Sequence, residues 1–232
     1  MKRIALVTLS LALIVHANAQ DNSGSTKKIK PYTVSVSELI FSWGNVEAKP
    51  LEPKSIVRFS AFLHLGQQVH FDFSEHAGFY TGLSLRNVGM INELNDTVKI
   101  KQRVYTLGIP VALKFGNMAG PFLAVGAEAE FAIAYKQKVF VNEEKSKTNI
   151  WFSDRTNIFL PSAFAELKLK QGMYVKFKYY LTDFLREGKQ AINVPNVGYN
   201  PTKSQMMYVS FGMAIRNKKG NPFTTPTHKD FL

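Results

Sequence analysis

The feature that most constrains the fold is an alternation of residue types that recurs along the sequence. In the segment 103–115, one set of alternate positions holds Tyr105, Leu107, Ile109, Val111, Leu113 and Phe115. The other set holds Val104, Thr106, Gly108, Pro110, Ala112 and Lys114. Because successive side chains of a β-strand point to opposite faces, this pattern predicts a strand with one apolar face and one face of small or charged residues.

Eight segments share this alternation, and we interpret each of them as a strand. They are 34–44, 56–65, 78–89, 103–115, 121–137, 158–170, 173–184 and 205–216. Most reach the roughly 9–11 residues that cross a bilayer, whereas strands of soluble proteins average about 5–6. Small residues and charges on the second face suit the interior of a narrow barrel filled by its own side chains. The sequence therefore predicts an all-β fold, a transmembrane antiparallel up-and-down β-barrel of about eight strands.

The beginning of the chain predicts export. Lys2 and Arg3 precede an apolar run from Ile4 to Val15, and Ala17-Asn18-Ala19 fits the small-residue rule for signal peptidase. That run is shorter than the roughly 20 residues of a membrane-spanning helix. We expect an outer-membrane protein divided into a signal peptide (1–19), a mobile N-terminal segment (20–33), the barrel (34–216) and a C-terminal tail (217–232). No cysteine is present, so disulfides play no part in holding the barrel together.

Loop lengths suggest an orientation for the barrel. With the N-terminus in the periplasm, the long connections 45–55, 90–102, 138–157 and 185–204 face outward, while 116–120 and 171–172 are tight inner turns, as is typical of such barrels. The connection 66–77 is too long for a turn, and its alternate apolar residues suggest a short extra strand or a plug. Aromatic residues are expected on the lipid-facing side near the outer rim, namely Trp43, Phe59, Tyr105, Tyr135 and Phe159.

Charged residues on the faces opposite the apolar ones are expected to converge on the barrel axis. They are Glu38, Arg58, Arg86, Lys114, Glu128, Glu130, Glu166, Lys168, Lys176, Lys178 and Arg216. Unpaired charges in so narrow an interior would be very costly. We interpret the set as a structural network that blocks conduction, with a proton or ion path as the alternative.

The expected outer loops are rich in lysine and arginine, and loops on a rigid scaffold often carry binding sites. The candidate ligand-binding residues are Lys145, Lys147, Trp151 and Arg155. Their expected partners are outer-membrane lipids, in particular lipopolysaccharide phosphates, or other envelope proteins. Ordinary solvated charge explains the loops equally well. The formal net charge of +12 does not indicate nucleic-acid binding here, because we expect the chain to be exported.

No catalytic constellation is evident, and no cofactor or metal is expected. The mature histidines are His64, His70, His76 and His228, and none is expected near the outer rim, where a hydrolytic triad would need one. The spacing of His70 and His76 matches no structural metal motif. The sequence thus favours a non-enzymatic structural or surface-binding barrel. The alternatives are a component of a secretion assembly, a lipid-modifying enzyme and a narrow pore.

Four segments carry a resemblance to a known family. They are Thr106 to Phe115 with its central Ile109-Pro110, Phe122 to Glu130, Tyr179 to Phe184, and Tyr208 to Gly212. Their order over 34–216 resembles the PorT-like outer-membrane β-barrel family, which is similar in architecture to small OmpA/OmpX-type barrels. The resemblance implies an outer-membrane barrel, and the name-giving member is linked to secretion and gliding machinery. Residues 217–232 depart from the pattern, since such barrels usually end on the last strand with an aromatic residue.

Overall fold

The structure is a computed structural model that describes residues 29–48, 51–142, 144–189, 191–192, 194 and 199–217. The expected signal peptide, most of the N-terminal segment and the tail from residue 218 lie outside the described residues. The strands are β1 (Tyr32–Glu47), β2 (Lys54–Ile56), β3 (Arg58–Ser60), β4 (Leu65–Asp72), β5 (Ala77–Asn95), β6 (Val98–Gly116), β7 (Phe122–Val141), β8 (Glu144–Trp151), β9 (Phe159–Lys168), β10 (Met173–Tyr180) and β11 (Lys203–Arg216). A 3-10 turn, η1 (Lys170–Gly172), joins β9 to β10. Within the described ranges, no helix is long and apolar enough to cross a membrane.

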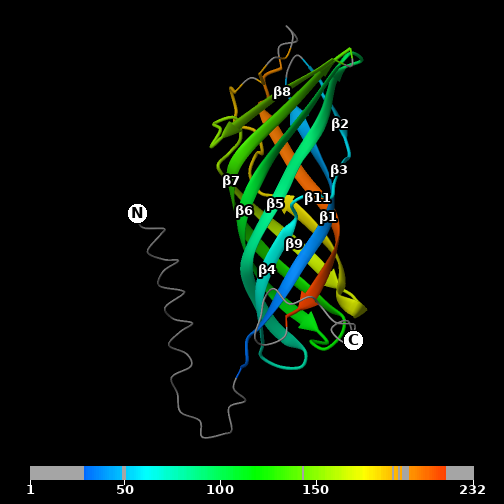
Figure 1. Ribbon diagram of the computed structural model, residues 1–232, viewed down its shortest axis with the longest axis vertical. Coiled ribbons are helices and arrows are strands. Elements are labelled where there is room, and N and C mark those ends of the chain that lie inside the picture. The colour runs from blue at the N-terminus through cyan, green and yellow to red at the C-terminus, as the bar shows by residue number, and fades with distance from the viewer. Residues whose placement is uncertain are drawn as a thin grey trace, which may run out of the picture.

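All eleven strands belong to one antiparallel sheet that closes on itself (Figure 1). Closure is made by β1 and β11, which pair from Val34 with Arg216 to Glu47 with Lys203. Two positions of the ring are filled by broken strands, one by β2, β3 and β4 and the other by β8 and β9. The predicted barrel of eight antiparallel strands is therefore confirmed.

Large apolar side chains cover the outside of the barrel, and the assignment of faces in β6 is confirmed. Leu107, Ile109 and Val111 are 43–50% exposed, whereas Ala112 and Lys114 on the opposite face are buried. Similar outward positions on neighbouring strands are held by Leu39, Phe41, Leu83, Leu123, Val125, Leu167, Phe177 and Phe211. Such a continuous apolar exterior suits hydrocarbon rather than water, so the barrel is transmembrane.

Of the two expectations for 66–77, the short extra strand is confirmed and the plug is wrong, because this segment lies in the barrel wall. Residues 65–72 form β4, the lower part of the second ring position, and the connection to β5 is the tight turn 73–76. The sequence does not reveal this ring position as one strand because a bulge separates β3 from β4. Ser60 pairs with Ile40 but Leu65 pairs with Ser37, so five residues advance against three of β1. The two extra residues bend outward, leaving Phe62 exposed and Leu63 at a φ of 61°.

Two of the expected outer loops are instead continuous hairpins. β5 and β6 remain paired as far as Asn95 and Val98, and β7 and β8 as far as Val141 and Glu144. These strands rise together beyond the rest of the barrel wall (Figure 1). We call this part, with its strands β5 to β8, the projecting sheet. By contrast, the strand expected over 173–184 ends at Tyr180, and the connection to β11 is irregular.

The expected lipid-facing position of Tyr135 is also wrong, because β7 changes face within the projecting sheet. Tyr105 pairs with Ala134 but Thr106 pairs with Ala132, so β7 contains one extra residue at this level. Above the bulge the odd-numbered side chains of β7 point inward. Tyr135 is 1% exposed, and its hydroxyl accepts a hydrogen bond from Gln102 Nε2 at 3.0 Å. Phe59 and Phe159 do point outward, as expected.

Apolar packing fills the mouth of the barrel. Inward residues of the projecting sheet, including Val88, Ile100 and Val139, form one cluster with residues of the β10–β11 connection. From that connection the cluster includes Phe184, Leu185 and Tyr199. The described part of the connection therefore folds over the lumen.

Candidate functional site

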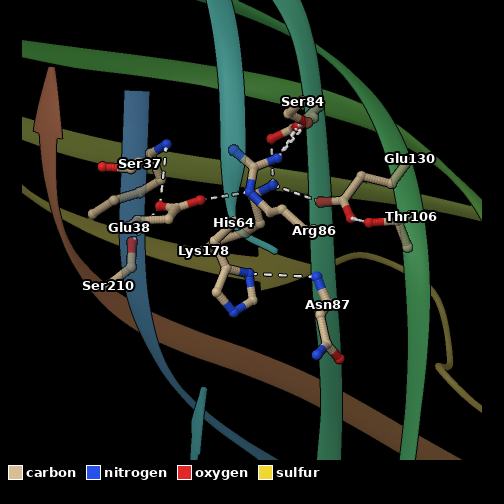
Figure 2. Close-up of polar contacts among 12 residues, drawn as sticks. Ser37, Glu38, His64, Ser84, Arg86, Asn87, Thr106, Glu130, Lys178 and Ser210 are labelled. Carbon is tan, nitrogen blue, oxygen red and sulfur yellow. Dashed lines mark hydrogen bonds and ion pairs between the residues drawn. The ribbon is translucent and has the colours of Figure 1, made fainter. Parts of the chain in front are cut away.

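Charged side chains meet in the middle of the lumen around Arg86 of β5. Its Nε donates to Glu38 Oε1 at 2.6 Å, and its Nη1 donates to Ser84 Oγ at 2.5 Å and forms an ion pair with Glu128. In Figure 2 the Arg86 guanidinium lies between Glu38 and Ser84. These side chains come from β1 (Glu38), β5 (Ser84 and Arg86) and β7 (Glu128). They meet because all three strands direct their even-numbered residues inward at this level.

Two lysines of β10 complete this group, which we call the lumen network. Lys178 pairs with Glu128 and, at 2.6 Å, with Glu130 Oε1. Lys176 lies 3.0 Å from Glu166 Oε2 and 3.7 Å from Glu38 Oε2. The network consists of Glu38, Arg86, Glu128, Glu130, Glu166, Lys176 and Lys178. All are buried, so every charge is compensated by a neighbour rather than by water.

Four carboxylates face three cations in the lumen network, and hydroxyl groups offset the excess negative charge. Ser210 Oγ donates to Glu38 Oε2 at 2.7 Å, and Thr106 Oγ1 donates to Glu130 Oε2 at 2.7 Å. Tyr180 also donates to Glu130, at 3.1 Å. An eight-stranded barrel is just wide enough for its own side chains. Here those side chains are paired charges at mid-height and apolar groups above them.

Four of the interior charges expected from the sequence lie outside this network. Lys114 lies below it, where it pairs with Asp72 and contacts His70 Nδ1 at 3.2 Å. Lys168 and Arg216 lie toward the inner end, over the rings of Phe122 and Tyr32 at 5.2 and 4.0 Å. The expected lumenal position therefore holds for Lys114, whereas Lys168 is half-buried and Arg216 is exposed at the inner end of the barrel. The alternation does not give heights along the axis.

The fourth, Arg58, forms hydrogen bonds with the barrel wall where the bulge between β3 and β4 interrupts strand pairing. The bulge leaves the backbone of Asn87 in β5 without a strand partner on that side. Arg58 Nη1 donates to the Asn87 carbonyl at 3.1 Å. The Asn87 amide donates to His64 Nδ1 at 3.4 Å, as Figure 2 shows. Sequence reasoning missed His64 because this role arises from the register shift alone.

The projecting sheet carries a second group of charges on its outer surface. We call it the basic face, and it consists of Lys99, Lys101 and Arg103 of β6, Lys136 and Lys138 of β7, and Lys145 and Lys147 of β8. These residues alternate with inward, buried ones such as Ile100 and Val139. The face lies directly above the apolar exterior of the barrel, which we call the apolar belt, and Tyr105 lies at the boundary between the two. Lys136 Nζ lies 5.0 Å from the centre of the Tyr105 ring.

Cations oppose one another across this sheet. Arg103 pairs with Lys136, Lys101 with Lys138, and Lys138 in turn with Lys147. Partial burial, followed by repulsion from the neighbouring cations, lowers the pKa of Lys138 below its ordinary value; this residue lies outside the membrane-spanning part of β7. A hollow between the strands is lined by Arg103, Lys136, Gln137, Lys138, Lys147, Thr148 and Asn149.

The four candidate binding residues expected from the sequence lie at two different places in the structure. Lys145 and Lys147 lie on the basic face, and Trp151 lies at its lower end, 66% exposed. Arg155 lies against the β10–β11 connection, where its carbonyl accepts the Arg186 amide at 2.9 Å. The other cations of the basic face were visible in the sequence as loop charges. They form one surface because β6, β7 and β8 are paired there. Because these segments were expected to be loops, that surface was not predicted from the sequence.

Near Arg155, an exposed ion pair ties two outer segments together. Asp154 pairs with Lys189, and this hydrogen bond is the main reason why the pKa of Asp154 lies below its ordinary value. Within the described residues, no group of three or more His, Cys, Asp and Glu side chains could hold a metal ion. His70 lies in the lumen beside Gln68, and His76 lies in the exposed inner turn.

Together these features define a class of protein: a small transmembrane β-barrel with a filled lumen and a basic outer sheet. No protein-family model matches the sequence. No curated protein matches it either.

Solved structures of small barrels resemble the fold. Ail, the attachment invasion locus protein of Yersinia pestis, is 9% identical, with 80% of this chain and 97% of that chain covered and a TM-score of 0.35. Neisserial surface protein A is 7% identical, with 81% and 99% covered and a TM-score of 0.41. The outer membrane protein OprG from Pseudomonas aeruginosa is 12% identical, with 81% and 96% covered and a TM-score of 0.34. At these identities and TM-scores, none of the likenesses bears on what this chain binds.

Proposed function

We propose that this chain is a non-enzymatic outer-membrane barrel that acts as a structural and surface-binding protein through its projecting sheet. Placement in the outer membrane rests on the transmembrane barrel together with the expected signal peptide at residues 1–19. In this orientation the projecting sheet extends outward from the cell. The candidate contact residues are those of the basic face with Trp151, and the expected partners are anionic groups at the cell surface.

One observation carries this proposal: the lumen is filled, whereas the basic face is open. Paired charges occupy the lumen around Arg86, and the β10–β11 connection covers the mouth with apolar side chains such as Phe184. A narrow pore or an ion path would have to pass both layers. The outer sheet, in contrast, presents its cations directly to the surroundings.

Planar-bilayer recording of the refolded protein tests the closed lumen. We expect no conductance above that of the protein-free membrane, and steady channel currents would contradict the proposal. Folding is checked in the same sample by a heat-modifiable gel shift. Mass spectrometry of lipid A from deletion and wild-type cells tests the lipid-modifying alternative, and we expect identical profiles.

A second candidate function is membership of a secretion assembly, in line with the PorT-like resemblance. The specific observation that favours it is the open edge of β8, which pairs with β7 and with no other described strand. An open strand edge can accept a strand from a partner. Crosslinking from a photoreactive residue placed at Thr148 in intact cells would capture an envelope protein if this candidate is correct, and would yield uncrosslinked barrel if it is not.

A further inference from the structure

We propose that the basic face binds the phosphate groups of glycolipid headgroups in the leaflet that surrounds the outer half of the barrel. This inference rests on the proposed function, because the face meets that leaflet only if the projecting sheet points away from the cell. It goes further by naming the partner: a phosphorylated lipid of the membrane itself rather than a soluble polymer.

The first argument is the repulsion built into the sheet. Like charges directly opposite each other on neighbouring strands destabilise a sheet. Here Arg103 opposes Lys136, and Lys138 has a cation opposite it on both sides, Lys101 and Lys147. Bound anions would remove this repulsion, and a phosphate can accept hydrogen bonds from several cations at once.

The second argument is the scarcity of carboxylates on this face. Within the part of the chain that the structure describes, the face makes one ion pair, between Lys99 and Glu93 at 3.0 Å. The lumen network, in contrast, surrounds each cation with carboxylates. The lumen network thus pairs each of its cations with carboxylates, whereas most cations of the basic face have no carboxylate partner among the described residues.

The third argument is height. Strands rise about 3.3 Å per residue and tilt by roughly 35–45° in such barrels, so two residues correspond to about 5 Å along the membrane normal. Along β6 the outward residues are Ile109 and Leu107 in the belt, then Tyr105, then Arg103 and Lys101. Aromatic residues mark the interface between hydrocarbon and headgroups. The cations therefore begin about 5 Å above it, at the height of headgroup phosphates.

The fourth argument is the composition of the lower edge. Trp151 and Phe152 are 66% and 73% exposed, and the Phe152 amide donates to the Ile133 carbonyl at 2.9 Å, which holds this corner on β7. Two large exposed aromatics directly below a cluster of cations match a lipid, whose acyl chains lie below its phosphates. A soluble polyanion would make no use of them.

The experiment compares two triple variants in lipid nanodiscs. Lys101→Gln, Lys138→Gln and Lys147→Gln remove the centre of the basic face. The control, Lys30→Gln, Lys170→Gln and Lys203→Gln, removes the same charge from exposed positions elsewhere. Each protein is refolded into phosphatidylcholine nanodiscs with bisphosphorylated lipid A, and the retained lipid A is measured by native mass spectrometry. We expect roughly tenfold weaker retention for the first variant and wild-type retention for the control.

Two further arms separate the possible failures. Because the first variant removes opposed like charges, it should fold, and the heat-modifiable gel shift verifies this. Dephosphorylated lipid A should not be retained by the wild-type protein; equal retention would overturn the role of phosphate. If a soluble sulfated oligosaccharide binds through the same lysines while lipid A is not retained, the lipid proposal is wrong and surface binding stands. If neither binds, both are wrong.

Discussion

Removal of Arg86 from the lumen network should destabilise the barrel strongly, and the structure indicates by how much. Arg86 pairs with Glu38 and Glu128, and all three side chains are at most 3% exposed. Breaking a buried ion pair by removing one partner typically costs about 3–5 kcal/mol. In Arg86→Met, which keeps much of the volume, both carboxylates retain a lysine, at 3.7 Å in the case of Glu38 and Lys176. We therefore expect a loss near the lower end, about 3 kcal/mol.

The double variant Arg86→Met with Glu38→Gln separates charge from packing. If the loss arises from an uncompensated carboxylate, neutralising Glu38 should restore about 1–2 kcal/mol, within the usual range of coupling between contacting residues. Lys99→Gln serves as the exposed control. It breaks an ion pair whose side chains are 45% and 34% exposed, and it should change stability by no more than about 1 kcal/mol.

The assay is urea unfolding in lipid vesicles, followed by fluorescence of the two tryptophans, Trp43 and Trp151. The free energy of unfolding is compared across the four proteins at one pH and one lipid composition. An Arg86→Met protein as stable as the wild type would refute the reasoning. So would a double variant that is less stable than the single one, because the network would then not act through charge compensation.

Three further perturbations test other parts of the structure. Ile109→Arg places a cation against hydrocarbon and should cost about 2–4 kcal/mol near mid-membrane, measured by the same unfolding assay. Arg58→Met leaves the Asn87 carbonyl unpaired and should cost about 1–3 kcal/mol, with faster hydrogen exchange confined to the neighbouring wall. The pKa of Asp154 is lowered by Lys189, so their contact is present above the ordinary carboxyl pKa and is lost as the pH falls through the lowered value. The protection factors of the amide hydrogens in this outer segment should therefore fall in acid, after correction for the intrinsic pH dependence of exchange, and Asp154→Asn should abolish that fall.

The membrane-spanning part of the fold could be predicted because lipid imposes a simple rule on it. Leu107, Ile109 and Val111 had to point outward, and alternation with Ala112 and Lys114 revealed that face directly. Above Tyr105 the outward face becomes polar instead of apolar, because the strand is no longer surrounded by hydrocarbon. There the apolar residues point inward and the cations point outward. The positions that hold apolar residues lower in the strand therefore hold cations here, and the segment is easily taken for a polar loop.

Register could not be predicted from the same pattern. The single extra residue between Ala132 and Ala134 turns Tyr135 from the lipid side to the interior. The two extra residues after Ser60 interrupt the alternation, so β3 and β4 do not look like parts of one barrel strand. Bulges of this kind depend on pairing with a partner strand, so the sequence of one strand does not reveal them. The basic face was missed as a unit for the same reason.

The apolar cluster in the mouth has a consequence for how the barrel responds to its surroundings. Below the mouth, the wall depends on a hydrocarbon layer of suitable thickness. The part that contains Val88, Ile100 and Phe184 has an interior like that of a water-soluble protein. Thinning of the bilayer would therefore strain the lower wall alone, and the projecting sheet would keep its shape while the lipid around the base rearranges.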